Sequence, residues 1–213
     1  MRNLDFKGLS VKEFTKAAEK YETGDAGVYE LCKKDYPEIL EEIEEENFET
    51  LLDCGCGPAP MISLLHEKYP ERHYTGIDLT PKMIEKAREK NLDNTTFVVG
   101  DCENLPFEDD SFDVVICSMS MHHYPHPEKF LHGVKRVLKP NGRVILRDMT
   151  SYRPVLWFIN TVELPAVNMF GFGDVKVYSV EDIREMCNAV GLKLEKGEHR
   201  RWMRLHCVAR KIK

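Results

Sequence analysis

The sequence has no apolar run that approaches the ~20 residues needed by a membrane-spanning helix. Its first residues, Met1–Lys7, also lack the apolar core of a secretion signal. Basic charge is not in excess: 30 Lys and Arg stand against 36 Asp and Glu, and the net charge is −6. Proteins dedicated to nucleic-acid binding usually carry a basic excess. We therefore expect a cytoplasmic protein that neither spans a membrane nor binds nucleic acid.

The seven cysteines follow no regular spacing, and their number is odd. Disulfide frameworks usually have an even count at regular spacings in a secreted chain, so reduced thiols in the cytoplasm are expected. Two motifs suggest metal binding, Cys54-x-Cys56 and the adjacent His122 and His123. Neither has a second Cys/His pair at the spacing of a structural zinc site, so no metal is expected.

With 213 residues, the chain is long enough for one domain with its own core. From residue 49 onward, short apolar runs alternate with amphipathic stretches. The expected strands are 50–54, 74–78, 96–99, 113–118 and 143–147, and the expected helices are 61–69, 81–90 and 127–138. This alternation predicts a doubly wound α/β sandwich built on a parallel sheet.

The N-terminal 47 residues are charged and helical in pattern. Ser10 is a candidate N-cap, and Glu13 follows it at capping-box spacing. A second helix is expected over 28–43. The acidic run Glu41–Glu46 at its end is interpreted as a solvated helix face.

The last third of the chain departs from the alternating pattern. Residues 150–178 are apolar and aromatic. Ser179 is expected to open a helix that closes at Gly191. Two strand-like segments follow, 193–199 and 202–210, and they are close enough in sequence to be antiparallel neighbours. The basic residues Arg200, Arg201 and Arg204 are interpreted as part of a surface strand.

A glycine-rich turn follows the first strand, in Asp53-Cys54-Gly55-Cys56-Gly57. Glycines let the backbone approach a ligand, and the helix beyond offers unpaired N–H groups. A dinucleotide site needs a third glycine where Pro60 stands, and Asp53 is a poor neighbour for a pyrophosphate. Asp53 is better suited to a ligand that carries an ammonium group. A tight turn that binds nothing is the alternative.

Acidic residues also end the next two strands, at Asp78 and Asp101. An acid about 20 residues past the glycine turn suits the hydroxyls of a ribose. Asp101 suits an adenine amino group. Either acid could instead cap the turn that follows it. The fourth strand ends at Cys117 and Ser118, so four strand ends converge on the crevice where open α/β sheets bind ligands.

In these stretches the chain resembles the class I S-adenosylmethionine-dependent methyltransferases, in the branch that includes the ubiquinone and menaquinone C-methyltransferases. The matching stretches are Leu51–Gly57, Gly76–Ala87, Gly100–Phe107, Ser111–Val115 and Arg136–Gly142. The match is almost continuous over 50–148 and is specific for the cofactor-binding fold. Ala59 stands where a third glycine is usual, and Asn141 replaces a glycine in a turn, where Asn tolerates a left-handed backbone.

The resemblance implies a Rossmann-like sandwich with a seven-stranded, mostly parallel sheet, an antiparallel C-terminal strand, and S-adenosyl-L-methionine as cofactor. It divides the chain into an N-terminal helical lid, a cofactor-binding core, a substrate-facing insertion, and a C-terminal helix with strands, at 1–47, 48–149, 150–178 and 179–213. The cofactor-binding residues that it implies are Tyr21, Asp53, Gly55, Cys56, Gly57, Asp78, Leu79, Asp101, Cys102, Cys117 and Ser118.

Methyl transfer mainly requires an acceptor held in line with the methyl group and away from water. His122 and His123 follow the fourth strand and are the candidate catalytic residues, with His126 and Asp148 as further candidate bases. Packing or capping of the helix at Pro127 is the alternative role for the histidines. The aromatic residues of the insertion suggest an apolar or planar acceptor.

The expected function is therefore methyl transfer to a small molecule by a monomer or homodimer. One alternative is a module of the same fold that binds the cofactor without catalysis. A nicotinamide-dependent oxidoreductase is the other, and the missing third glycine and Asp53 count against it.

Overall fold

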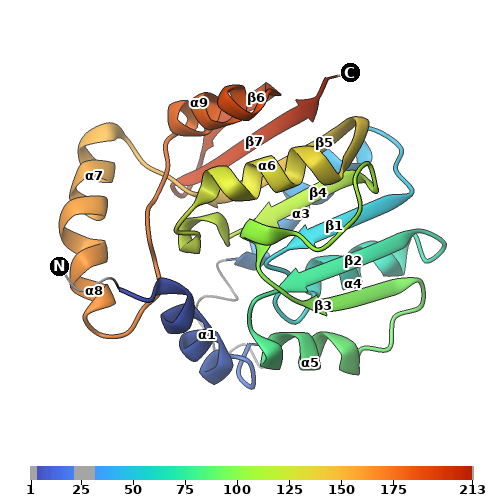
Figure 1. Cartoon of the computed structure of the whole chain (residues 1–213), viewed down its shortest axis with the longest axis horizontal. Helices are drawn as coiled ribbons and strands as arrows, with labels where there is room; N and C mark the ends of the chain where they lie inside the picture. The colour runs from blue at the N-terminus through green and yellow to red at the C-terminus, as the bar shows by residue number, and fades with distance from the viewer. Residues whose placement is uncertain (1–3, 22–31, 213) are drawn as a thin grey trace.

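The computed structural model describes residues 4–21 and 32–212 of the chain. A seven-stranded sheet in the order β3-β2-β1-β4-β5-β7-β6 forms its centre, with helices on both faces (Figure 1). Only β7 runs antiparallel to its neighbours, β5 and β6. The predicted doubly wound, mostly parallel sandwich is therefore confirmed. None of the described helices has the length and apolar character to cross a lipid bilayer.

The strands agree with the sequence prediction to within a few residues, except for the fifth. The strands are β1 Thr50–Cys54, β2 His73–Asp78, β3 Thr95–Val99, β4 Phe112–Ser118, β5 Leu138–Met149, β6 Leu192–Arg200 and β7 Arg204–Lys211. Strand β5 begins five residues early because Leu138 already pairs with Phe112, across an irregularity in the register. Asn141, in this early part of β5, has a φ of 67°, as the resemblance implied.

Proline begins several of the helices, where the missing N–H has no partner to lose. The helices are α1 Phe6–Ala17, α3 Tyr36–Glu44, α4 Pro60–Lys68, α5 Pro81–Glu89, α6 Pro127–Val137, α7 Arg153–Phe158, α8 Leu164–Asn168 and α9 Val180–Val190. The predicted ends of α9 are confirmed: Ser179 and Asp182 form a capping box, and Gly191 closes the helix with a φ of 76°.

Successive strand residues point to opposite faces of the sheet, and each face has its own core. On one face Leu52 and Val115 pack with α6 and α9. On the other, Leu51 and Ile116 pack with α3, α4 and α5. This arrangement buries both faces and leaves the carboxyl ends of the parallel strands free for a ligand.

Residues 150–178 form a helical arm beside the carboxyl edge of the sheet (Figure 1). Helices α7 and α8 are joined by the π-helical turn Ile159–Glu163. Leu156 and Leu164 face inward and pack with Val177. Trp157 is 65% exposed and Phe170 is 84% exposed, so these aromatic side chains do not fill the core.

Several sequence expectations at the chain ends are wrong. The N-cap of α1 is Asp5, whose carboxylate accepts from the Gly8 N–H, whereas Ser10 lies inside the helix. Asp5 reaches the free N–H groups earlier in the chain, so the helix begins before Ser10. Within the second expected helix, 28–43, Cys32 and Lys33 are helical and α3 begins at Tyr36 after a turn, whereas residues 28–31 lie outside the described residues.

Two charged residues expected at the surface are buried. Glu42 accepts hydrogen bonds from His206 and Lys196, so the acidic run is only partly a solvated face. Arg204 pairs with the buried Asp35, which also accepts from Arg147. These pairs attach α3 to β5 and β7. Trp202, expected in a strand, lies in the β6–β7 turn with a φ of 63°.

Candidate active site

A cavity opens at the carboxyl edge of the sheet, under α1. Its lining comes from the turns that follow β1, β2, β3 and β4, together with α1 itself. The lining residues are Lys7, Ser10, Phe14, Gly55, Asp78, Leu79, Thr80, Asp101, Cys102, Ser120, His123 and Tyr124. This is the crevice in which doubly wound sheets bind ligands.

The glycine turn requires its glycines for different reasons. Gly55 has a φ of +76°, and a Cβ there would lie 2.0 Å from Ser120 Oγ. Gly57 has a φ of +53° with open space at the Cβ position. Ala59, in the place of the third glycine, also has a left-handed backbone, with a φ of 60°. Its small side chain is tolerated there at a cost of about 1–2 kcal/mol.

Asp78 ties the glycine turn to the second strand. One of its carboxylate oxygens accepts from the Gly57 N–H at 2.9 Å, and the other accepts from the Thr80 N–H at 2.8 Å. Burial nevertheless raises the pKa of this carboxyl. Asp78 therefore both caps the turn and lines the cavity.

Asp53 is buried at the end of β1. Burial, and then the nearby charge of Asp78, raise the pKa of Asp53 to about 8. Among the described residues no basic side chain forms an ion pair with it. Its carboxyl group is thus suited to a cationic ligand, which would stabilise the ionised form.

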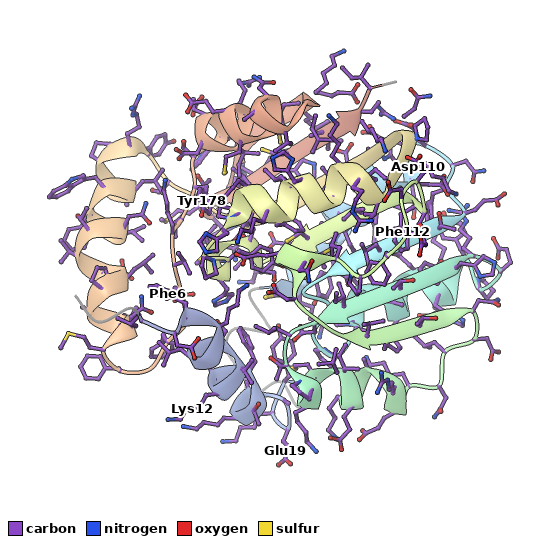
Figure 2. All side chains as sticks on the ribbon, in the orientation of Figure 1. Phe6, Lys12, Glu19, Asp110, Phe112 and Tyr178 are labelled. Carbon is purple, nitrogen blue, oxygen red and sulfur yellow. The ribbon has the colours of Figure 1, made fainter. Side chains whose placement is uncertain are left out.

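Helix α1 closes the cavity from outside. Lys7 forms ion pairs with Asp101, at 2.6 Å, and with Glu103. Phe14 packs edge-on against the ring of His123, with the ring centres 5.2 Å apart. Figure 2 shows Lys12, on α1, and Glu19, just beyond its end, directed away from the sheet. The helix thus presents one face to the cavity and the other to solvent.

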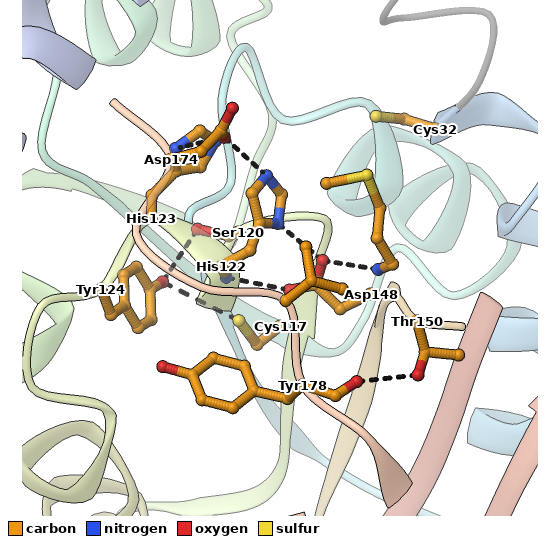
Figure 3. Close-up of polar contacts among 12 residues, drawn as sticks. Cys32, Cys117, Ser120, His122, His123, Tyr124, Asp148, Thr150, Asp174 and Tyr178 are labelled. Atoms are coloured by element: carbon orange, nitrogen blue, oxygen red, sulfur yellow. Dashed lines mark hydrogen bonds and ion pairs between the residues drawn. The ribbon is translucent and has the colours of Figure 1, made fainter. Parts of the chain in front are cut away.

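His122 and Asp148 form a buried pair at the ends of β4 and β5. His122 Nδ1 lies 2.6 Å from Asp148 Oδ1, and the His122 N–H donates to Asp148 Oδ2 at 3.1 Å (Figure 3). Burial alone would lower the pKa of His122, but the charge and hydrogen bond of Asp148 outweigh it and raise the pKa. For His123, burial and the neighbouring His122 lower the pKa to about 3, so its ring is neutral.

Asp174 joins the two histidines. One carboxylate oxygen lies 3.5 Å from His122 Nε2 and 3.3 Å from His123 Nδ1 (Figure 3). The loop that carries Asp174 is held over the histidines because the N–H groups of Val175 and Lys176 both donate to the His122 carbonyl. Asp174 and the histidines thus come together from distant parts of the sequence.

A second hollow lies on the other side of Asp174, under the helical arm. Its lining is mainly apolar and comes from the end of β5, the arm and the β6–β7 turn. The lining residues are Met149, Thr150, Ile159, Glu163, Leu164, Val167, Phe172, Asp174, Val177, Trp202, Met203 and Arg204. Asp174 lines this hollow and also contacts His123, which lines the first cavity.

The structure brings many of the sequence-predicted site residues to the first cavity. Those that line it are Gly55, Asp78, Leu79, Asp101, Cys102 and His123. Other predicted residues lie behind this lining, at the ends of β1 and β4, in the glycine turn, or in the pair that His122 forms with Asp148. They are Asp53, Cys56, Gly57, Cys117, Ser118 and His122. Ser118 Oγ is buried and has no hydrogen-bond partner among the described residues. Tyr21 is not part of the lining.

Sequence reasoning did not find Lys7, Ser120 or Asp174. Lys7 and Asp174 reach the site only through the placement of α1 and of the arm, and no local motif marks either of them. Ser120 follows a predicted strand end and could have been found from that position.

Comparisons with known proteins agree with this geometry. Residues 52–146 match the family model described as a methyltransferase domain. Over 144 residues the chain is 33% identical to a demethylmenaquinone methyltransferase from Thermotoga maritima, covering 67% of this chain and 62% of the relative. It is 43% identical over 100 residues to a phthiotriol/phenolphthiotriol dimycocerosates methyltransferase from Mycobacterium ulcerans. This match covers 46% of this chain and 37% of the relative.

Among solved structures, a Haloferax volcanii methyltransferase in complex with the Trm112 methyltransferase activator superposes with a TM-score of 0.80. That match covers 94% of this chain and 98% of the other at 21% identity, so it supports the fold alone. The chain spans less than two thirds of the length of the two curated relatives. The family match assigns residues 52–146 to the methyltransferase-domain family, and the sheet order and the cavity at its carboxyl edge are those expected from the resemblance to the class I S-adenosylmethionine-dependent methyltransferases.

Proposed function

We propose that this chain transfers the methyl group of S-adenosylmethionine to an apolar small molecule that carries a nucleophilic group. The cofactor occupies the cavity under α1. Asp78 accepts hydrogen bonds from the ribose hydroxyls, and Asp101 and Leu79 contact the adenine. Asp53, Gly55 and Ser118 lie along the methionine moiety, whose ammonium group stabilises the ionised form of Asp53. The buried, unpartnered Ser118 Oγ supports this placement.

The observation that carries the proposal is the position of Asp174 between the two hollows. The acceptor occupies the hollow under the arm, with its nucleophilic atom beside Asp174, His122 and His123. That atom gives an electron pair to the methyl carbon as the carbon–sulfur bond breaks. The bonding pair passes to sulfur, and S-adenosylhomocysteine leaves as a neutral thioether. When the attacking atom is a hydroxyl oxygen, its proton passes to the carboxylate of Asp174 beside it. Positioning and exclusion of water supply most of the acceleration.

An apolar acceptor suits the lining of the second hollow. Two relatives are named for apolar acceptors, demethylmenaquinone and phthiotriol dimycocerosates. The seven buried, free cysteines support a reducing compartment such as the cytoplasm. The proposal thus keeps the small-molecule acceptor and the location expected from the sequence.

The test is turnover to S-adenosylhomocysteine against a panel of hydroxylated apolar and polar acceptors, with mass spectrometry of the product. We expect methylation of one apolar class and little activity on polar acceptors. The matched variants are Leu164→Asp, inside the hollow, and Val162→Asp, on the exposed side of the arm. The first should raise the KM for the acceptor, and the second should not. Tight cofactor binding without turnover on any acceptor would instead favour a non-catalytic module.

A further inference from the structure

His122, His123 and Asp174 place three metal-ligating atoms within 4.8 Å of one another. We propose that these residues bind a divalent transition-metal ion, zinc in the simplest case, between the cofactor cavity and the acceptor hollow. The inference deepens the proposed function, because it concerns the place where the acceptor's nucleophilic group meets the methyl group. It also revises the expectation from sequence that the chain has no metal site.

Two of the three distances among these side chains match those between ligands of one metal ion, and the ring nitrogens of the two histidines lie within 4.8 Å of each other. Asp174 lies 3.3 Å from His123 Nδ1 and 3.5 Å from His122 Nε2. Two atoms that are each about 2.1 Å from a tetrahedral zinc lie about 3.4 Å apart. His123 Nδ1 is buried and has no hydrogen-bond partner among the described residues. A buried ring nitrogen without a partner is costly, and a metal ion would satisfy it.

Asp148 supports this arrangement from behind. It lies 2.6 Å from His122 Nδ1, opposite the ring nitrogen that faces Asp174. A carboxylate in this position accepts a hydrogen bond from the Nδ1–H of a metal-binding histidine, which leaves the Nε2 lone pair for the metal. Asp174 is fixed as well, because Asn168 donates to its backbone carbonyl at 2.7 Å and the next two N–H groups donate to the His122 carbonyl.

Acidic groups are in excess around the two imidazoles. Glu13, on α1, and Glu163, on the arm, both act electrostatically on Asp174. A divalent cation at the centre would relieve this repulsion.

Three protein ligands leave one tetrahedral position open, as in catalytic rather than structural zinc sites. His123 lines the cofactor cavity and Asp174 lines the acceptor hollow, so the open position lies between the two. An oxygen atom of the acceptor, from a hydroxyl or a carboxylate, is the ligand that fits it. The sequence motif alone could not show this site, because its third ligand comes from the arm.

The experiment is titration of the full chain with Co²⁺ and Zn²⁺ after treatment with a chelator, without cofactor or acceptor. Visible absorption reports the coordination of Co²⁺, and calorimetry reports the affinity for Zn²⁺. We expect one metal ion per chain, with bands of nitrogen and oxygen ligation and no thiolate charge-transfer band. A thiolate charge-transfer band would instead indicate that Co²⁺ binds to one or more of the seven cysteines.

Asp174→Asn and His123→Gln should each weaken Zn²⁺ binding at least tenfold. His126→Gln is the matched control, because this histidine is exposed on the same segment. Circular dichroism establishes that each variant is folded. The proposal is overturned if the wild-type chain binds no metal, if only thiolate ligation appears, or if both folded variants bind like the control. Because no turnover is measured, a failed metal titration leaves the methyltransferase proposal standing.

Discussion

Asp53→Asn should stabilise the ligand-free protein while it weakens cofactor binding. The carboxyl group is buried, and burial together with Asp78 raises its pKa from 3.8 to about 8. A raised pKa in the folded state means that the folded chain holds a proton that the unfolded chain releases above about pH 4. Asp53 therefore costs stability increasingly as the pH rises from about 4 to about 8.

The magnitude follows from the size of that shift. One pKa unit corresponds to about 1.4 kcal/mol, so the cost at pH 7 is about 4 kcal/mol. Asp53→Asn removes this cost and should raise the free energy of unfolding at pH 7 by up to about 4 kcal/mol. The difference between variant and wild type should shrink towards pH 4. Urea unfolding at a series of pH values measures it, with the exposed Asp93→Asn as control.

Cofactor affinity should change in the opposite direction. If the methionine ammonium group stabilises ionised Asp53, wild-type binding of S-adenosylhomocysteine releases a proton below about pH 8. The affinity should then rise with pH by up to about tenfold per unit in this range. Asp53→Asn should lose this component, while titration of the ligand's own amino group affects both proteins equally. Equal pH profiles in calorimetry, or a variant that is less stable at pH 7, would refute the reasoning.

Other substitutions test other parts of the site. Asp78→Asn should weaken S-adenosylhomocysteine binding at least tenfold, since charge-assisted hydrogen bonds contribute about 1.5–3 kcal/mol each, and an unchanged Kd would show that the ribose lies elsewhere. Gly55→Ala should destabilise by about 3 kcal/mol through backbone strain and the clash with Ser120, against about 1–2 kcal/mol for Gly57→Ala; equal losses in urea unfolding would contradict this geometry of the glycine turn. Lys7→Met removes the ion pairs of α1 with Asp101 and Glu103 and should speed hydrogen exchange across residues 6–17, with only a small loss of thermal stability because the Lys7 side chain itself is 33% exposed. Unaltered exchange in α1 would mean that apolar contacts such as that of Phe14 hold this helix in place.

The sheet could be predicted from the sequence because its signals are local. The runs that form β1, β2 and β4 are short, apolar and bounded by glycine, aspartate or serine. Acids that follow parallel strands share one edge of the sheet, so Asp78, at the end of β2, and Asp101, after β3, could be assigned to the cavity without coordinates.

The rest of the site depends on contacts between distant segments. Asp174 has no local signal, and only the backbone hydrogen bonds to His122 bring it over the histidines. Ser10 is suited to a helix cap, but Asp5 precedes it and Ser10 instead donates to the Gly173 carbonyl at 3.4 Å. Glu42 is typical of a solvated helix face until β7 brings His206 against it. At each of these positions, tertiary contacts therefore outweigh the local structural preference of the residue.

The structure of the complex with S-adenosylhomocysteine tests the central claim most directly. We expect the ribose hydroxyls on Asp78, the adenine beside Asp101 and Leu79, and the sulfur directed towards His123 and Asp174. A ligand with its adenine in the hollow under the arm, or with its sulfur directed away from Asp174, would contradict the proposed arrangement of cofactor and acceptor.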